Sequence, residues 1–131
     1  MDALIKDYYW FTVLVASNGL LLLLLTINVS WLRMTRRIGV GDGGNKQLLT
    51  AIRVHSNGTE QVPLFALIVL ALIFSGASES LLSGLVLVFT GSRLMHAYGM
   101  LFRQLRLRQI GAGITYLAQA VALVGLIINC L

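Results

Sequence analysis

Apolar residues fill four long stretches of the chain, separated by three short polar breaks. The first stretch runs from Tyr8 to Leu32, and none of its 25 residues is charged. As a helix it would reach roughly 37 Å, which exceeds the hydrocarbon core of a bilayer at about 30 Å. The other stretches cover 48–74, 81–102 and 110–131. The pattern predicts an all-α, integral membrane four-helix bundle, with residues 1–131 forming a single transmembrane domain.

The composition supports a membrane protein and excludes a small soluble domain. Hydrophobic residues make up 57% of the chain and charged residues only 11%. Soluble domains have about 25% charged residues, and one of this size could not bury so much apolar surface. The single cysteine, Cys130, rules out a disulfide within the chain.

The charged residues are unevenly distributed among the three predicted loops. Four basic residues fall in 33–47 and three in 103–109, whereas 75–80 contains only Glu79. The positive-inside rule therefore places the first and third loops in the cytoplasm and both termini on the opposite side. The net charge of +5 does not predict nucleic-acid binding, because no aromatic residues are interleaved with the basic ones.

The first half of the second stretch is unusually polar for a membrane span. It reads Arg53-Val-His-Ser-Asn-Gly-Thr-Glu-Gln-Val-Pro63. Charged side chains are costly inside a bilayer and usually mark functional sites. Helical spacing places Arg53, Asn57 and Glu60 on one face, where they could contact a single ligand. His55 points roughly the opposite way, which predicts a second site, reached in a neighbouring subunit.

The third stretch contains Arg93 and His96, whose spacing puts them on one helix face. A purely structural alternative exists for the charged residues. Arg53 and Glu60 could neutralise each other, and Arg53 and Arg93 could extend to the nearby membrane interface. The arginines at 36, 37 and 103 are interpreted more simply as topology determinants.

The polar run resembles the signature of the MAPEG family, the membrane-associated proteins of eicosanoid and glutathione metabolism. That signature has the form R-x-x-x-N-x-x-E-x-x-P at the start of the second helix, and Arg53, Asn57, Glu60 and Pro63 match it. The Gly-Asp-Gly-Gly run of the first loop and the Gly-Ser-Arg-Leu-Met-His run of the third stretch resemble small bacterial members. The resemblance covers nearly the whole chain.

The resemblance implies a homotrimer in the bacterial inner membrane, with glutathione bound as co-substrate between adjacent subunits near the cytoplasmic face. Arg53, Asn57 and Glu60 would hold glutathione, and His55 would reach a site from the neighbouring chain. Arg33, at the end of the first span, would bind the glutathione carboxylates.

The same resemblance assigns the helix-three pair Arg93 and His96 to the glutathione site. The family usually has a tyrosine four residues after the second of these, where this chain has Met100. Gln61 stands where leukotriene-type enzymes have another tyrosine.

The thiol-activating arginine of the family lies at the start of the fourth helix, and Arg108 matches it best, with Arg106 as the alternative. A guanidinium beside the sulfur would favour thiolate over thiol. We therefore expect a glutathione transferase or peroxidase acting on lipophilic electrophiles, without a metal ion. Another low-molecular-weight thiol in place of glutathione stays open, as does a non-catalytic lipid-binding or scaffold protein. A four-span drug exporter is disfavoured, because residues 8–32 lack the acidic residue that proton exchange needs.

Overall fold

The computed structural model describes residues 2–131 and, over this range, contains four helices. They are α1 (Asp2–Arg36), α2 (Lys46–Phe74), α3 (Glu79–Leu101) and α4 (Leu105–Cys130). Each is long and apolar enough to cross a membrane. The predicted all-α membrane bundle is therefore confirmed.

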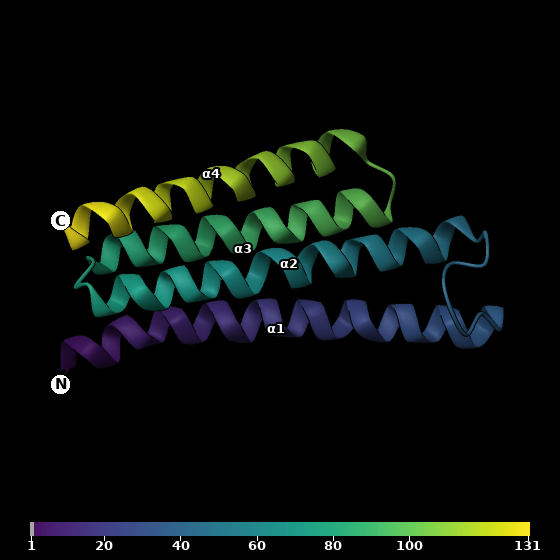
Figure 1. Ribbon diagram of the computed structural model, residues 1–131, viewed down its shortest axis with the longest axis horizontal. Coiled ribbons are helices and arrows are strands. Elements are labelled where there is room, and N and C mark those ends of the chain that lie inside the picture. The colour runs from purple at the N-terminus through teal and green to yellow at the C-terminus, as the bar shows by residue number, and fades with distance from the viewer. Residues whose placement is uncertain (1) are drawn as a thin grey trace.

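The helices run alternately up and down, so neighbours in sequence are antiparallel (Figure 1). The α1–α2 and α3–α4 connections lie at one end, and the α2–α3 connection lies at the other end with the C-terminus. Both α1 and α4 pack against α2 and α3, but over residues 2–131 they do not contact each other. The two middle helices therefore form the centre of the bundle and carry most of its buried residues.

The main hydrophobic core lies between α2 and α3, around two stacked aromatic rings. Phe65 and Phe89 have ring centroids 3.8 Å apart and nearly parallel planes, and both side chains are fully buried. Leu14 of α1 and Ala118 of α4 belong to the same cluster. Because this core is entirely apolar, it holds the helices together without contributing to a polar site.

The connection between α3 and α4 is shorter than the sequence predicted. A loop was expected over 103–109, but α4 begins at Leu105. Arg106 and Arg108 therefore lie on the first turn of a helix. The difference has a physical reason, since long arginine side chains can reach the membrane interface from within a helix.

Two arginines occupy the left-handed backbone region just after a helix ends. Arg37 follows α1 with φ 55° and Arg103 follows α3 with φ 56°. After Arg103, the N–H of Gln104 donates to the carbonyl of Gly99 at 2.8 Å, which satisfies a free helix-end carbonyl. Glycine usually takes this position, as Gly76 does after α2. A side chain there costs roughly 1 kcal/mol.

Helices α3 and α4 approach each other at backbone distance. A Cβ atom on Gly111 of α4 would lie only 2.6 Å from the backbone nitrogen of His96 on α3. One turn away, the buried hydroxyls of Ser92 and Thr115 form a 2.8 Å hydrogen bond. Small residues that allow close approach are typical of packed membrane helices. These contacts, made by Ser92, His96, Gly111 and Thr115, form the α3–α4 seam. The seam fixes the register of the two helices.

Candidate functional site

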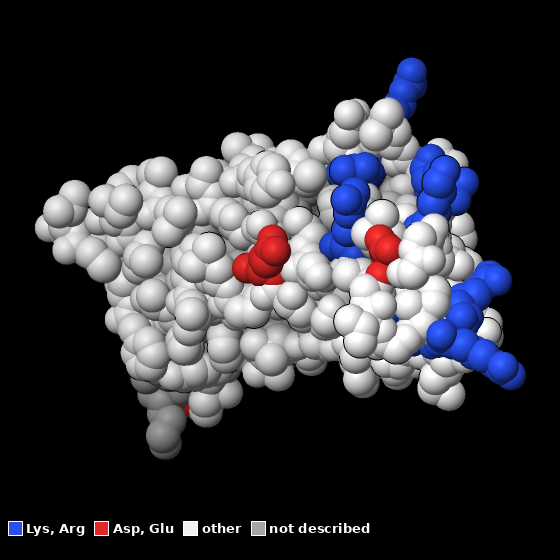
Figure 2. Space-filling model, turned by 45° about the vertical axis from the view of Figure 1, so that its right-hand side comes forward, with Lys and Arg blue, Asp and Glu red and all other residues white. Residues whose placement is uncertain are grey.

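Basic side chains gather at the end of the molecule where α1 meets α2 and α3 meets α4 (Figure 2). At this end α2, α3 and α4 border a cavity of about 290 Å³ that is open to the outside. Three arginines line it, together with five other residues: Arg53, Arg103, Arg108, Leu49, Thr50, Gly99, Met100 and Leu105. With three guanidinium groups and no acidic side chain among these lining residues, the arginine cavity suits an anionic ligand.

The arginine cavity brings together two of the residues predicted from the sequence. Arg53 comes from α2 and Arg108 from the first turn of α4. Both side chains are exposed. The third guanidinium, that of Arg103, was predicted only to set topology. No sequence signal places it here, because its position depends on the left-handed turn after α3.

Arg93 lies inside the bundle, with only 3% of its surface exposed. Its Nη2 atom donates a 2.7 Å hydrogen bond to Oδ1 of Asn57 on α2. The alternative in which Arg93 extends to the membrane interface is therefore wrong. The hydrogen bond to the amide oxygen partly stabilises the buried guanidinium, whereas Nε has no hydrogen-bond partner within the described residues.

His96 lies one turn after Arg93 on α3 and is also buried, with 5% exposed. Within the described part of the chain, its Nδ1 atom has no hydrogen-bond partner. Unpaired buried polar groups are costly, so each one needs a physical cause. Arg93 and His96 therefore each place a polar atom without a hydrogen-bond partner among the described residues in the interior of the bundle.

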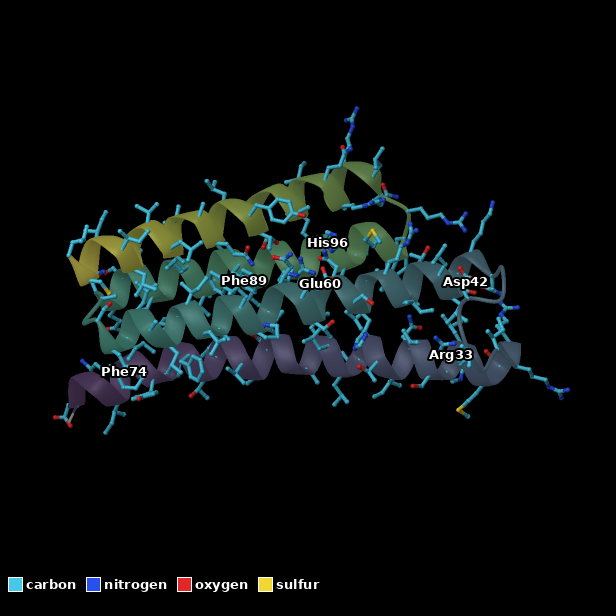
Figure 3. All side chains as sticks on the ribbon, in the orientation of Figure 1. Arg33, Asp42, Glu60, Phe74, Phe89 and His96 are labelled. Atoms are coloured by element: carbon cyan, nitrogen blue, oxygen red, sulfur yellow. The ribbon has the colours of Figure 1, made fainter. Side chains whose placement is uncertain are left out.

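Arg53, Asn57 and Glu60, the three residues predicted on one face of α2, lie in three different surroundings. Arg53 lines the arginine cavity, and Asn57 accepts the hydrogen bond from Arg93. Glu60 is exposed and lies near the middle of the helix, far from Arg33 and Asp42 at the basic end (Figure 3). The structure thus places one residue of the stripe in the cavity and leaves Glu60 outside its lining.

His55 faces α1 of the same chain, on the other side of α2. Its Nε2 atom lies 2.9 Å from Oγ1 of Thr26. The hydroxyl of Thr26 already donates to the carbonyl of Leu22 at 2.8 Å. It therefore accepts from His55, which assigns the ring proton to Nε2. The opposite-face geometry predicted for His55 is present in the fold.

Arg33 binds the α1–α2 connection and does not line the arginine cavity. Its Nη1 atom donates to the carbonyl of Gly41 at 2.8 Å. Together with Arg37 it borders a separate depression at the end of α1. Arg106 is exposed on the first turn of α4 and is not among the cavity-lining residues either.

Met100 and Gln61 stand where the family resemblance led us to expect tyrosines, and they lie in different surroundings. Met100 lines the arginine cavity, so a thioether without a hydrogen-bond donor forms the wall there. Gln61 of α2 accepts a 2.7 Å hydrogen bond from the amide of Gln119 on α4. Where a tyrosine would place a phenol, this amide pair links α2 directly to α4.

Comparisons with known proteins give a consistent result. Residues 11–128 match the model of the MAPEG family. "Inner membrane protein YecN" of Escherichia coli (strain K12) is 36% identical over 101 residues, which cover 77% of this chain and 77% of YecN. The protein of the same name from Escherichia coli O6:H1 matches equally well. No solved structure matches the chain.

Proposed function

Since the chain belongs to the MAPEG family, we propose that it is a glutathione transferase or peroxidase of the bacterial inner membrane. Its second substrate would be a lipophilic electrophile that arrives from the bilayer. The observation that carries the proposal is the cavity that Arg53, Arg103 and Arg108 line together.

The arginine cavity supplies the charges that glutathione needs. Glutathione carries two carboxylates and a thiol, and guanidinium groups bind carboxylates through paired hydrogen bonds. In the proposed arrangement Arg53 and Arg103 bind the two carboxylates at the opposite ends of the tripeptide, and Arg108 lies beside the sulfur of the central cysteine. A cation next to a thiol lowers its pKa and so raises the fraction of reactive thiolate.

Both proposed reactions start from this thiolate. In the transferase reaction, sulfur forms a bond to an electrophilic carbon, and the leaving group departs with its bonding electrons. In the peroxidase reaction, sulfur attacks the terminal oxygen of a hydroperoxide, the O–O bond breaks and the alcohol leaves after protonation. The sulfenic acid formed on glutathione then condenses with a second glutathione to give a disulfide and water.

We further propose that the subunit assembles as a homotrimer with glutathione between adjacent chains. The exposed carboxylate of Glu60 supports this, because a charge facing lipid in mid-membrane is costly unless another chain covers it. Asn57, Glu60, Arg93 and His96 would then complete the site from one subunit. His55 and Arg33, which lie outside the arginine cavity, would contribute from the neighbouring subunit.

Isothermal titration of glutathione into the detergent-solubilised protein tests the proposal. We expect saturable heat that S-hexylglutathione suppresses by competition. Arg53→Ala should weaken binding at least tenfold, because it removes a charged hydrogen-bonding partner worth about 1.5–3 kcal/mol. Absence of heat with the wild-type protein, together with no competition, would contradict the proposal.

A non-catalytic lipid-binding or scaffold protein on the same fold is the second candidate. Met100 favours it, because the cavity wall there lacks the hydroxyl that a tyrosine would supply. The ultraviolet absorbance of thiolate separates the two candidates. An enzyme should form thiolate from bound glutathione at neutral pH, whereas a scaffold protein should give no such signal.

A further inference from the structure

At Gly99, which lines the arginine cavity, α3 and α4 approach each other at backbone distance. A Cβ atom on Gly99 would stand 2.9 Å from Cα of Arg108 and 2.9 Å from the carbonyl carbon of Leu107. The backbone nitrogen of Arg108 would be nearer still. All three are helix backbone atoms, so none of them can move aside as a flexible side chain would. At this position only glycine lets α4 come so close.

Two backbone hydrogen bonds also link Gly99 to Arg108 by way of Gln104. The carbonyl of Gly99 accepts the N–H of Gln104 at 2.8 Å, and the carbonyl of Gln104 accepts the N–H of Arg108 at 3.0 Å. Gly99 and Arg108 are thus linked both through the short connection and through direct backbone contact. The first turn of α4 therefore has little freedom to shift relative to α3.

Close contacts between α3 and α4 continue along the seam beyond Gly99. Helix α4 therefore cannot pivot freely around the Gly99–Arg108 contact. Gly111 meets the backbone of His96, and the buried Ser92–Thr115 hydrogen bond follows one turn further. Each pair lies a few residues deeper in the bundle on both helices. The direction of α4, and with it the starting point of the Arg108 side chain, is set by this row of close contacts.

We propose that Gly99 is a positioning residue for the thiol-activating arginine. By admitting the backbone of Arg108, it fixes where that guanidinium enters the cavity opposite Arg53. This inference rests on the proposed function, because it assumes that Arg108 acts on the glutathione sulfur. An added methyl group at position 99 pushes the first turn of α4 away and draws the guanidinium from the sulfur. The attraction between the two charges weakens with distance.

The test is the thiol pKa of bound glutathione, read from thiolate absorbance during a pH titration of the solubilised protein. Gly99→Ala should raise this pKa by about one unit, within the range that a neighbouring charge controls. Gly91→Ala on α3 and Gly113→Ala on α4 are the matched controls. A Cβ at either position meets nothing within 4 Å, so both should keep the wild-type pKa.

A double variant separates positioning from general loss of packing. If Gly99 acts through Arg108, adding Gly99→Ala to Arg108→Ala should cause no further change in the thiol pKa, so the two effects are not additive. Gly111→Ala is the second variant, because it spreads the seam without placing an atom next to Arg108. It should raise the pKa by a smaller amount, and it keeps the proposal testable if Gly99→Ala does not fold.

The outcomes distinguish this inference from the proposed function. If the wild-type protein forms no thiolate with glutathione, the proposed function fails and the role of Gly99 fails with it. If the wild-type protein forms thiolate and a folded Gly99→Ala or Gly111→Ala variant keeps the same thiol pKa, only the positioning role is overturned. Additive effects in the double variant would overturn it as well.

Discussion

The guanidinium of Arg93 donates a 2.7 Å hydrogen bond to the side-chain oxygen of Asn57 and so joins α3 to α2 inside the bundle. The bond holds a positive charge that is almost fully buried inside the bundle. The Gln61–Gln119 pair similarly joins α2 to α4. Polar links therefore connect α2 to both helices of the α3–α4 seam.

Asn57→Leu should destabilise the protein by about 2 kcal/mol, since it leaves the buried guanidinium of Arg93 without its acceptor. Asn57→Asp should retain stability, because a carboxylate can accept the same bond. Thermal unfolding in detergent measures both variants. The double variant Asn57→Leu with Arg93→Leu should be more stable than Asn57→Leu alone; a lower stability would contradict the role assigned to this bond.

The two arginines on the first turn of α4 should differ in their effect on glutathione. Arg108 lines the arginine cavity and Arg106 does not. Arg108→Ala should therefore lower the thiolate fraction of bound glutathione about tenfold or more, since it removes the nearest cation. Arg106→Ala should have the smaller effect on the same absorbance measurement. The reverse order would transfer the activating role to Arg106 and remove the basis for the role of Gly99.

Arg103→Gly should change stability and ligand binding in opposite directions. Glycine relieves the left-handed backbone at φ 56°, which should stabilise the helix end by up to about 1 kcal/mol. The same change removes a guanidinium from the cavity and should weaken glutathione binding. Arg37→Gly is the matched control, because its φ of 55° is nearly the same and it lies outside that cavity. Calorimetric titration and thermal unfolding together test the pair, and equal binding by the two variants would exclude Arg103 from the site.

Glu60→Lys should disrupt the proposed trimer. Glu60 is exposed near the middle of α2, where we expect a neighbouring chain to cover it, and a reversed charge would lose its partners there. Glu79→Lys, at the exposed start of α3, should leave the assembly intact. Native mass spectrometry of detergent-solubilised protein gives the subunit number. A wild-type monomer, or a trimer that tolerates Glu60→Lys, would contradict the proposed interface.

The helices were predictable because membrane burial leaves a direct mark on the sequence. A long and mostly apolar run is typical of a membrane-spanning helix. Residues 8–32 form such a run without any charge, and the number and order of the spans follow from the four apolar runs. The start of α4 was not predictable from the pattern of apolar and charged residues alone. Arg106 and Arg108 alternate with leucines, and the same residues suit either a loop or a helix end that projects its cations to the interface.

The candidate site was predictable only within each helix. Spacing placed Arg53 with Asn57, and Arg93 with His96, on common faces. It could not show that Arg93 would reach Asn57, because this contact depends on how α3 is rotated against α2. The role of Arg103 in the cavity and the contact of Gly99 with Arg108 depend in the same way on the close packing of α3 and α4.

The exposed side chain of Cys130 gives the protein a built-in chemical label. It is the single cysteine of the 131 residues, and the C-terminus lies at the end of the bundle opposite the basic connections (Figure 1). A membrane-impermeant maleimide applied to sealed vesicles would therefore react at one defined end of the subunit. The orientation of the bundle in its membrane can thus be read from the unaltered chain, with no cysteine introduced and none removed.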